Sequence, residues 1–175
     1  MSFQDLLAVI ASPKLRDVAL HWDAARGTRR IPAWKDIDPS AIAPHLPIVW
    51  AWKYDRDTDT FVGRLAGDTI VEAFGRSPRG VTMQEFFGEK WHAQFFAKHK
   101  RIVTQPAFTH ESGQVLIHTQ HYGQGERIIM PLAADGVTGD GIFGATEYAM
   151  NPNAPYGESA RRFLATDRIT YFPLD

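Results

Sequence analysis

The seven histidines are the residues of this sequence best suited to bind a metal or to move protons: His21, His45, His92, His99, His110, His118 and His121. His118 and His121 are three residues apart in a segment with strand character, which places them on opposite faces of a strand. His110 and His118 have the same parity, but they belong to separate strand segments and no third ligand accompanies them. We therefore expect no metal site.

None of the short motifs that mark common enzyme active sites is found. The sequence lacks a nucleophile elbow, a phosphate-binding loop, a paired metal-ligand helix and a nicotinamide fingerprint. Gly123-Gln124-Gly125 is expected to be a turn between strands, without the strand-to-helix context that phosphate binding requires. The absence of cysteine excludes a catalytic thiol, thiolate-bound zinc and iron–sulfur clusters. We expect no catalytic residue and a protein that is not an enzyme.

Composition indicates one ordinary globular domain. The chain has 175 residues, 44% hydrophobic and 22% charged, with a formal net charge of −1. Basic residues near Trp34 are expected to form a solvated face, because the neutral net charge and the lack of a reader motif disfavour nucleic acid as a partner. No apolar run approaches the about 20 residues needed to cross a bilayer, and no basic start precedes an apolar block at the N-terminus. We expect no membrane partner and a cytoplasmic location.

Apolar periodicity and turn residues predict helices first, then a hairpin, more helices and a late antiparallel meander. The predicted helices are 3–11, 13–27, a turn or two in 38–46, 68–74, 82–87 and 89–104. The predicted strands are 47–54, 61–66, 107–111, 115–122, 127–133 and 141–149, and the apolar end of the tail, 169–174, is able to dock. A sheet made from a hairpin and a meander must bury one face, and the helices are the lid available. The fold class is α+β, with room for a cavity between lid and sheet.

This order of elements resembles the PAS fold, and its details resemble a bacterial, stand-alone branch of that family, formerly a domain of unknown function. The residues that carry the resemblance are Trp22, Arg26-Gly27, Ile31-Pro32, Asp36 to Pro39, Leu46-Pro47, Arg64 to Gly67, Phe74-Gly75, Gly80, Glu126 and Pro131-Leu132. The resemblance implies an antiparallel five-stranded sheet with helices covering one face and an N-terminal helical extension. It divides the chain into an extension (1–30), a PAS-like domain (31–150) and a C-terminal tail (151–175).

A ligand in a cavity of this kind would contact the long helix and the late strands. The residues expected to line it are Arg64, Phe95, Phe96, His99, Met130, Thr146 and Tyr148. Which parity of the late strands points inward stays open, as does whether Gly144 and Ala145 make room for a ligand or for tight packing. By the resemblance to haem-binding PAS proteins, His99 is the place for a haem ligand, although a solvated or hydrogen-bonded histidine is the favoured interpretation.

Two further sets of residues carry alternatives. Arg64 lies in an otherwise apolar strand and needs either a structural ion pair, for example with Glu126 or Glu147, or an anionic ligand. The second set is an apolar stripe in 3–11 that must be covered either by the chain's own domain or by a second copy in a homodimer. Its residues are Phe3, Leu6, Leu7 and Ile10.

We therefore expect a sensor and signalling module that binds an unidentified small molecule between the long helix and the sheet and acts in trans on a signalling protein. The competing interpretation is an interaction scaffold that senses nothing, because its many Phe and Trp side chains fill the cavity.

Overall fold

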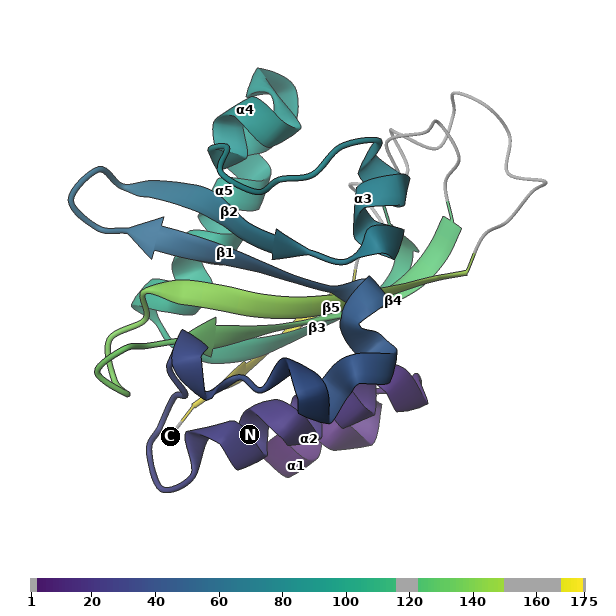
Figure 1. Ribbon diagram of the computed structural model, residues 1–175, viewed down its shortest axis with the longest axis vertical. Coiled ribbons are helices and arrows are strands. Elements are labelled where there is room, and N and C mark those ends of the chain that lie inside the picture. Colours follow the sequence, from purple (N-terminus) through teal and green to yellow (C-terminus); the bar gives the residue numbers. More distant parts are fainter. Residues whose placement is uncertain (1–2, 116–122, 150–167, 175) are drawn as a thin grey trace.

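An antiparallel sheet with helices on both faces organises the protein in the computed structural model, which describes residues 3–115, 123–149 and 168–174 (Figure 1). The α-helices are α1 (Phe3–Val9), α2 (Pro13–Arg26), α3 (Asp68–Phe74), α4 (Met83–Phe87) and α5 (Glu89–Thr104). The 3-10 helices are η1 (Trp34–Asp36) and η2 (Pro39–Ile48). The strands are β1 (Val49–Asp55), β2 (Thr60–Ala66), β3 (Ala107–Val115), β4 (Gly123–Leu132), β5 (Gly141–Ala149) and β6 (Arg168–Pro173).

The strands form one sheet in the order β2-β1-β5-β4-β3-β6, and each neighbouring pair is antiparallel. The early hairpin and the late meander join where β1 pairs with β5, with Trp50 opposite Gly144. The predicted α+β class and its antiparallel core are confirmed. The structure adds β6, from the apolar end of the tail, to the five-stranded sheet that the PAS resemblance implies, and β6 pairs with the outer edge of β3. The predicted strand over 115–122 lies almost wholly outside the described residues.

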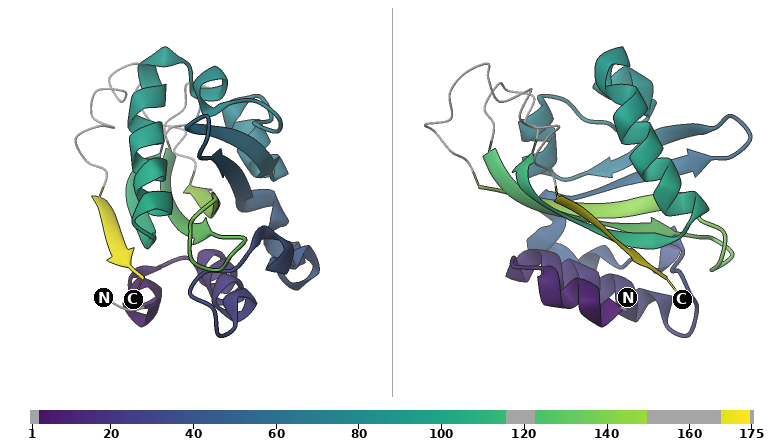
Figure 2. Two further views of the ribbon diagram at one scale, coloured as in Figure 1. Left: turned by 90° about the vertical axis from the view of Figure 1, so that its left-hand side faces the viewer. Right: turned by 180° about the vertical axis from the view of Figure 1, so that it is seen from behind.

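Each face of the sheet has its own helical cover (Figures 1 and 2). Alternate residues of β1, β4 and β5 point to opposite sides, because side chains in a strand alternate. Trp50, Trp52 and Ile129 pack with α3, α4 and α5, whereas Ala51 and Ile128 pack with α1, α2 and η2. The helices expected to cover one face are α3 to α5, and the N-terminal extension covers the other. No described helix is both long and apolar enough to span a membrane.

The N-terminal helices belong to the same folded unit as the sheet. Leu6 and Ile10 are buried, and Phe3 and Leu7 pack against the same core cluster, so the apolar stripe is covered by the chain's own domain. The homodimer surface predicted from these residues is therefore wrong, because the sheet already buries it. On α2, the fully buried Trp22 donates its indole N–H to the carbonyl of Pro131 at 2.8 Å. The hydrophobic core therefore continues across residue 30, where the sequence predicted a boundary between the N-terminal extension and the domain.

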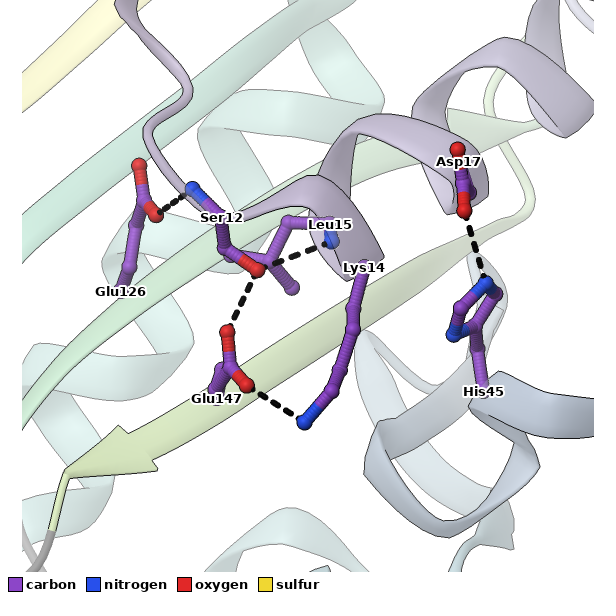
Figure 3. A network of polar contacts seen from close by, with 7 residues as sticks. All are labelled: Ser12, Lys14, Leu15, Asp17, His45, Glu126 and Glu147. Carbon is purple, nitrogen blue, oxygen red and sulfur yellow. Dashed lines mark hydrogen bonds and ion pairs between the residues drawn. The ribbon is translucent and has the colours of Figure 1, made fainter.

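Two glutamates hold the start of α2 on the sheet (Figure 3). Glu126 and Glu147 lie opposite each other on β4 and β5. Glu126 accepts the backbone N–H groups of Ala11 and Ser12 at 2.8 and 2.7 Å. Glu147 accepts the Ser12 hydroxyl at 2.5 Å and the Lys14 ammonium at 2.6 Å. Both carboxylates are thus used in positioning α2, and neither forms an ion pair with Arg64, so the ion pairs considered for Arg64 are wrong.

Candidate functional site

A small pocket lies between the sheet and the helices α3 to α5. Its lining residues are Trp50, Trp52, Ile70, Phe74, Pro78, Phe86, Phe87, Phe95, His99, Arg127 and Tyr148. The cavity volume is about 30 Å³, which holds about one or two water molecules. Helix α5 provides one wall, β1, β4 and β5 provide the floor, and residues 70–87 close the remaining side.

Stacked aromatic rings form most of the wall. The rings of Phe87 and Phe95 are nearly parallel, with centroids 4.1 Å apart. Phe86 meets Phe87 edge-on at 4.9 Å and Phe74 at 5.2 Å, and Trp52 lies 5.6 Å from Phe86. Such tilted and offset contacts are the preferred geometries of aromatic pairs. The wall is therefore a continuous apolar surface built from three helices and one strand.

The floor carries a buried cluster of charges. Glu111 of β3 is 2% exposed, and its carboxylate lies 3.0 Å from the Lys98 ammonium and 3.6 Å from the Arg127 guanidinium. Burial raises the pKa of Glu111, but the Lys98 and Arg127 charges outweigh this effect and hold the pKa below its usual range. Glu111 is therefore ionised at neutral pH and neutralises part of the positive charge below the pocket.

Thr146 ties this charge cluster to the aromatic floor. Its hydroxyl oxygen accepts one hydrogen bond from the indole N–H of Trp50 and another from Nε of Arg127, each at 2.9 Å. The neighbouring Gly144 leaves the space that the Trp50 ring occupies, because a Cβ atom there would overlap that ring. Tight packing, rather than room for a ligand, is thus the reason for this small residue.

His99 is buried on the inner face of α5, with the rings of Trp50 and Phe61 about 6 Å from its own. Burial, reinforced by the positive charges of Lys98 and Arg127, holds the pKa of His99 well below its usual value, so the imidazole is neutral. A haem is a ligand of the size that needs a cavity of about 300 Å³ or more, and the adjoining cavity is about 30 Å³. The residues around His99 therefore do not fit a haem.

Tyr148 places in the pocket a hydroxyl group that forms no well-aligned hydrogen bond within the described part of the protein. Its hydroxyl is buried and has no hydrogen-bond partner of good geometry among the residues that the structure describes. Burial raises the pKa of Tyr148, and the charge of Arg127 and its poorly aligned contact with the hydroxyl oppose part of that rise, so the phenol is protonated at neutral pH. A buried hydroxyl without a partner costs about 1–3 kcal/mol, which makes this atom a candidate ligand contact.

The structure brings four of the seven predicted ligand residues together. Phe95, His99 and Tyr148 line the pocket, and Thr146 lies on the same face of β5, next to the floor. Phe96 packs beside Phe61 and outside the pocket lining. Two residues predicted to line the pocket lie elsewhere. Met130 is on the opposite face of the sheet, in the core against α2, and Arg64 stacks on Trp34 away from the pocket.

The sequence-based list missed Arg127 and the aromatic residues of β1, α3 and α4. The pattern of β1, with Trp50, Trp52 and Tyr54 at alternate positions, carried a signal, since it marks one face as strongly aromatic. Among the described residues there is no group of three or more His, Asp or Glu side chains placed to hold a metal. His118 and His121 lie outside the described part of the chain.

Comparison with solved structures finds proteins of similar fold. VqmA bound to DPO superposes with a TM-score of 0.50 at 14% identity, over 63% of this chain and 56% of that chain. The Vibrio cholera VqmA–ligand–DNA complex gives 0.49 at 14% identity, over 62% and 49%. An RNA-binding light-oxygen-voltage receptor gives 0.40 at 12% identity, over 67% and 33%. The match thus spans about half of the VqmA chain and a third of the receptor chain, and at this identity VqmA supports the fold alone.

Comparison of the sequence itself gives the family. No curated protein matches the chain. A family model described as a PAS domain matches residues 10–147, a range that begins directly after α1 and extends from α2 through β4 and most of β5. The predicted family resemblance is confirmed: the chain belongs to the PAS domain family, whose members commonly act in sensing and signalling.

Proposed function

We propose that this PAS domain is a sensor that binds a small molecule in the pocket between α5 and the sheet and passes the resulting change to a partner protein. The observation that carries the proposal is the combination of an aromatic wall with the charge of Arg127 and the buried hydroxyl of Tyr148, which has no well-aligned partner among the described residues. Small-molecule sites are mainly apolar and contain a few polar groups that fix the ligand's orientation.

The size of the pocket constrains how a ligand enters. A cavity of about 30 Å³ admits anything larger than a few atoms only after side chains move. About half of the lining comes from residues 70–87, whose backbone pairs with the sheet through two isolated bridges, Val62 to Thr82 and Gly63 to Arg79. The floor, by contrast, belongs to the hydrogen-bonded ladder of β1, β5 and β4. A ligand would therefore displace residues 70–87 and leave the strand pairing intact. That displacement, together with the shift of the Arg127 side chain and strand that accompanies it, is the signal we propose.

The same small volume supports a second candidate, an interaction scaffold whose pocket is filled by its own side chains. The stacked rings of Phe87 and Phe95 already occupy the space that a flat ligand would take. In this candidate the aromatic wall serves stability, and the partner binds the outside of the domain. The two candidates differ in one observable, the presence of a bound molecule.

The proposal contains a partner in trans, a cytoplasmic location and no catalytic step. VqmA, which shares the fold, has been solved with DPO, and this supports a small molecule as the ligand class. The net charge of −1 and the absence of active-site motifs support a protein without enzymatic activity and without nucleic acid as its partner.

Native mass spectrometry of the intact chain, purified from the cell that makes it, tests the proposal. The wild-type protein should carry a small molecule that is released on denaturation. The Tyr148→Phe variant should carry less of it while melting at a similar or higher temperature, because the lost hydroxyl has no well-aligned protein partner. Met130→Leu, a similar change on the opposite face, is the matched control and should retain the molecule. Wild-type protein that releases nothing would exclude the sensor and favour the scaffold.

A further inference from the structure

A second, larger hollow lies on the opposite side of the sheet from the aromatic pocket, beside the β1–β2 hairpin. Its volume is about 390 Å³, and its lining residues are Ala33, Trp34, Lys35, Lys53, Arg64, Ala134 and Asp140. Lys53 lies between Trp52 and Tyr54, both of which pack toward α5, so its side chain points to the other face. This hollow, which we call the basic hollow, shares no lining residue with the aromatic pocket.

The charge in the basic hollow is not balanced by the protein. Three cations face one carboxylate, Asp140, which also accepts the backbone N–H of Ala134 at 2.8 Å. Within the described part of the chain, Lys35, Lys53 and Arg64 form no ion pair within 4 Å. The formal surplus is two positive charges, which matches a small dianion.

The guanidinium of Arg64 is positioned to recognise such a dianion. It stacks over the Trp34 ring with a separation of 4.5 Å from the ring centroid, which holds the guanidinium in place and leaves the N–H groups at its edge free of protein acceptors in the described residues. The side chain is exposed overall, but partial desolvation lowers the pKa of Arg64, and the charge of Asp140 opposes this effect only in part. A planar fork of N–H donors fits a carboxylate or a phosphate with two parallel hydrogen bonds.

Trp34 links this site to the rest of the domain. The η1 turn that carries it is fixed by Asp36, whose carboxylate accepts the backbone N–H of Ala33 at 2.7 Å and the guanidinium of Arg29 at 2.6 Å. Asp36 forms its ion pair with Arg29 and interacts with Lys35 only at a separation greater than 4 Å. The hollow is therefore a built feature: a fixed aromatic platform, a stacked guanidinium and two lysines at its rim.

We propose that the basic hollow binds a small dianion bearing a phosphate group or two carboxylates, with the Arg64 fork on the anion and the ammonium groups of Lys35 and Lys53 balancing its charge. Asp140 lies at the same hollow and would accept a hydrogen bond from a hydroxyl or N–H donor of the ligand while repelling a more highly charged anion. The proposal is independent of the aromatic pocket, so failure of one leaves the other standing.

Isothermal titration calorimetry of the intact chain at constant ionic strength and slightly alkaline pH tests the proposal, with inorganic phosphate and succinate as separate dianion probes and chloride as the control anion. At least one dianion should bind, and the arm that responds distinguishes phosphate from dicarboxylate chemistry. Arg64→Gln should weaken that binding by about tenfold or more, the loss expected for a hydrogen-bonded charge. Arg79→Gln removes the same charge from an exposed position outside the hollow and should leave the affinity unchanged.

Three results would overturn the basic hollow as a site. One is no binding of any probe at about 10 mM, an affinity too weak to be specific. Another is equal weakening by Arg64→Gln and Arg79→Gln, which would indicate a general charge effect. The third is unchanged binding in Arg64→Gln. Far-UV circular dichroism of both variants checks that the fold is intact, and Lys53→Gln provides a second variant if Arg64→Gln loses its fold.

Discussion

Thr146 should contribute to stability through its hydroxyl rather than through its methyl group. The side chain is fully buried, and its oxygen is the acceptor for both Trp50 Nε1 and Arg127 Nε at 2.9 Å. The substitution Thr146→Val keeps the volume and removes only the acceptor. Thr146→Ser keeps the acceptor and removes one methyl group, so the two variants separate the two contributions.

The magnitude follows from the donors that each substitution leaves without a partner. Removing the acceptor strands one neutral and one charged N–H in a buried site, and each costs about 1–3 kcal/mol. Arg127 keeps its contact with Glu111 at 3.6 Å, which moderates the charged contribution. We expect a loss of about 3 kcal/mol for Thr146→Val and about 1 kcal/mol for the methyl lost in Thr146→Ser.

Equilibrium urea unfolding followed by far-UV circular dichroism measures both losses. For a urea dependence of about 2 kcal/mol per molar, Thr146→Val should lower the midpoint by about 1.5 M and Thr146→Ser by about 0.5 M. A Val variant as stable as the wild type, or a Ser variant less stable than the Val variant, would show that the hydroxyl does not hold the floor together.

Three other substitutions test the packing and charges on which the fold depends. Gly144→Ala should destabilise the protein by about 1–3 kcal/mol in urea unfolding, because the new methyl overlaps the Trp50 ring; an unchanged midpoint would contradict that close approach. Trp22→Phe should cost about 2 kcal/mol or more, since it strands the buried carbonyl that accepts the indole N–H and leaves a cavity; a smaller loss would mean that the helix is held elsewhere. The pKa of Glu147 is lowered by the hydrogen bond from Lys14, then by that from the α2 cap. Its stabilisation is therefore present above the unfolded pKa of about 4.3 and is lost as the pH falls through the lower folded pKa. Glu147→Gln should flatten the dependence of stability on pH between about pH 5 and pH 3, and a slope equal to that of the wild type would refute the contribution.

The sequence was sufficient for the elements and their order, because local signals fix them. Ser12 followed by Pro13 predicts the start of α2, and the structure confirms it with the Ser12 hydroxyl accepting the N–H of Leu15. Gly75 ends α3 with a left-handed φ of 69°, which glycine adopts without strain. Each of these features depends on residues within one helical turn, so a single sequence contains the whole signal.

The sequence alone could not predict which side of β4 and β5 meets α5, or which distant residues pair with each other. Periodicity shows that Met130 and Arg127 have opposite parities, but it does not tell which parity meets α5, since both faces of this sheet are buried. The pairing of Arg64 with Trp34 joins residues from a strand and a distant turn, and no local rule predicts it. The prediction of ligand-lining residues was therefore wrong where it depended on knowing which helix covers which face of the sheet.

Consecutive residues on β4 and β5 connect the two faces of the sheet. Arg127 and Thr146 point into the floor of the aromatic pocket, while the adjacent Glu126 and Glu147 hold the start of α2. Because these neighbours share a peptide bond, a ligand that shifts Arg127 along its strand also shifts the carboxylate that accepts the Ser12 N–H. A scaffold with a filled core gains nothing from this link beyond stability, whereas a sensor gains a direct route from pocket to N-terminal helices. The short path between the two polar clusters is therefore a physical reason, independent of the cavity itself, to place signal output on α2.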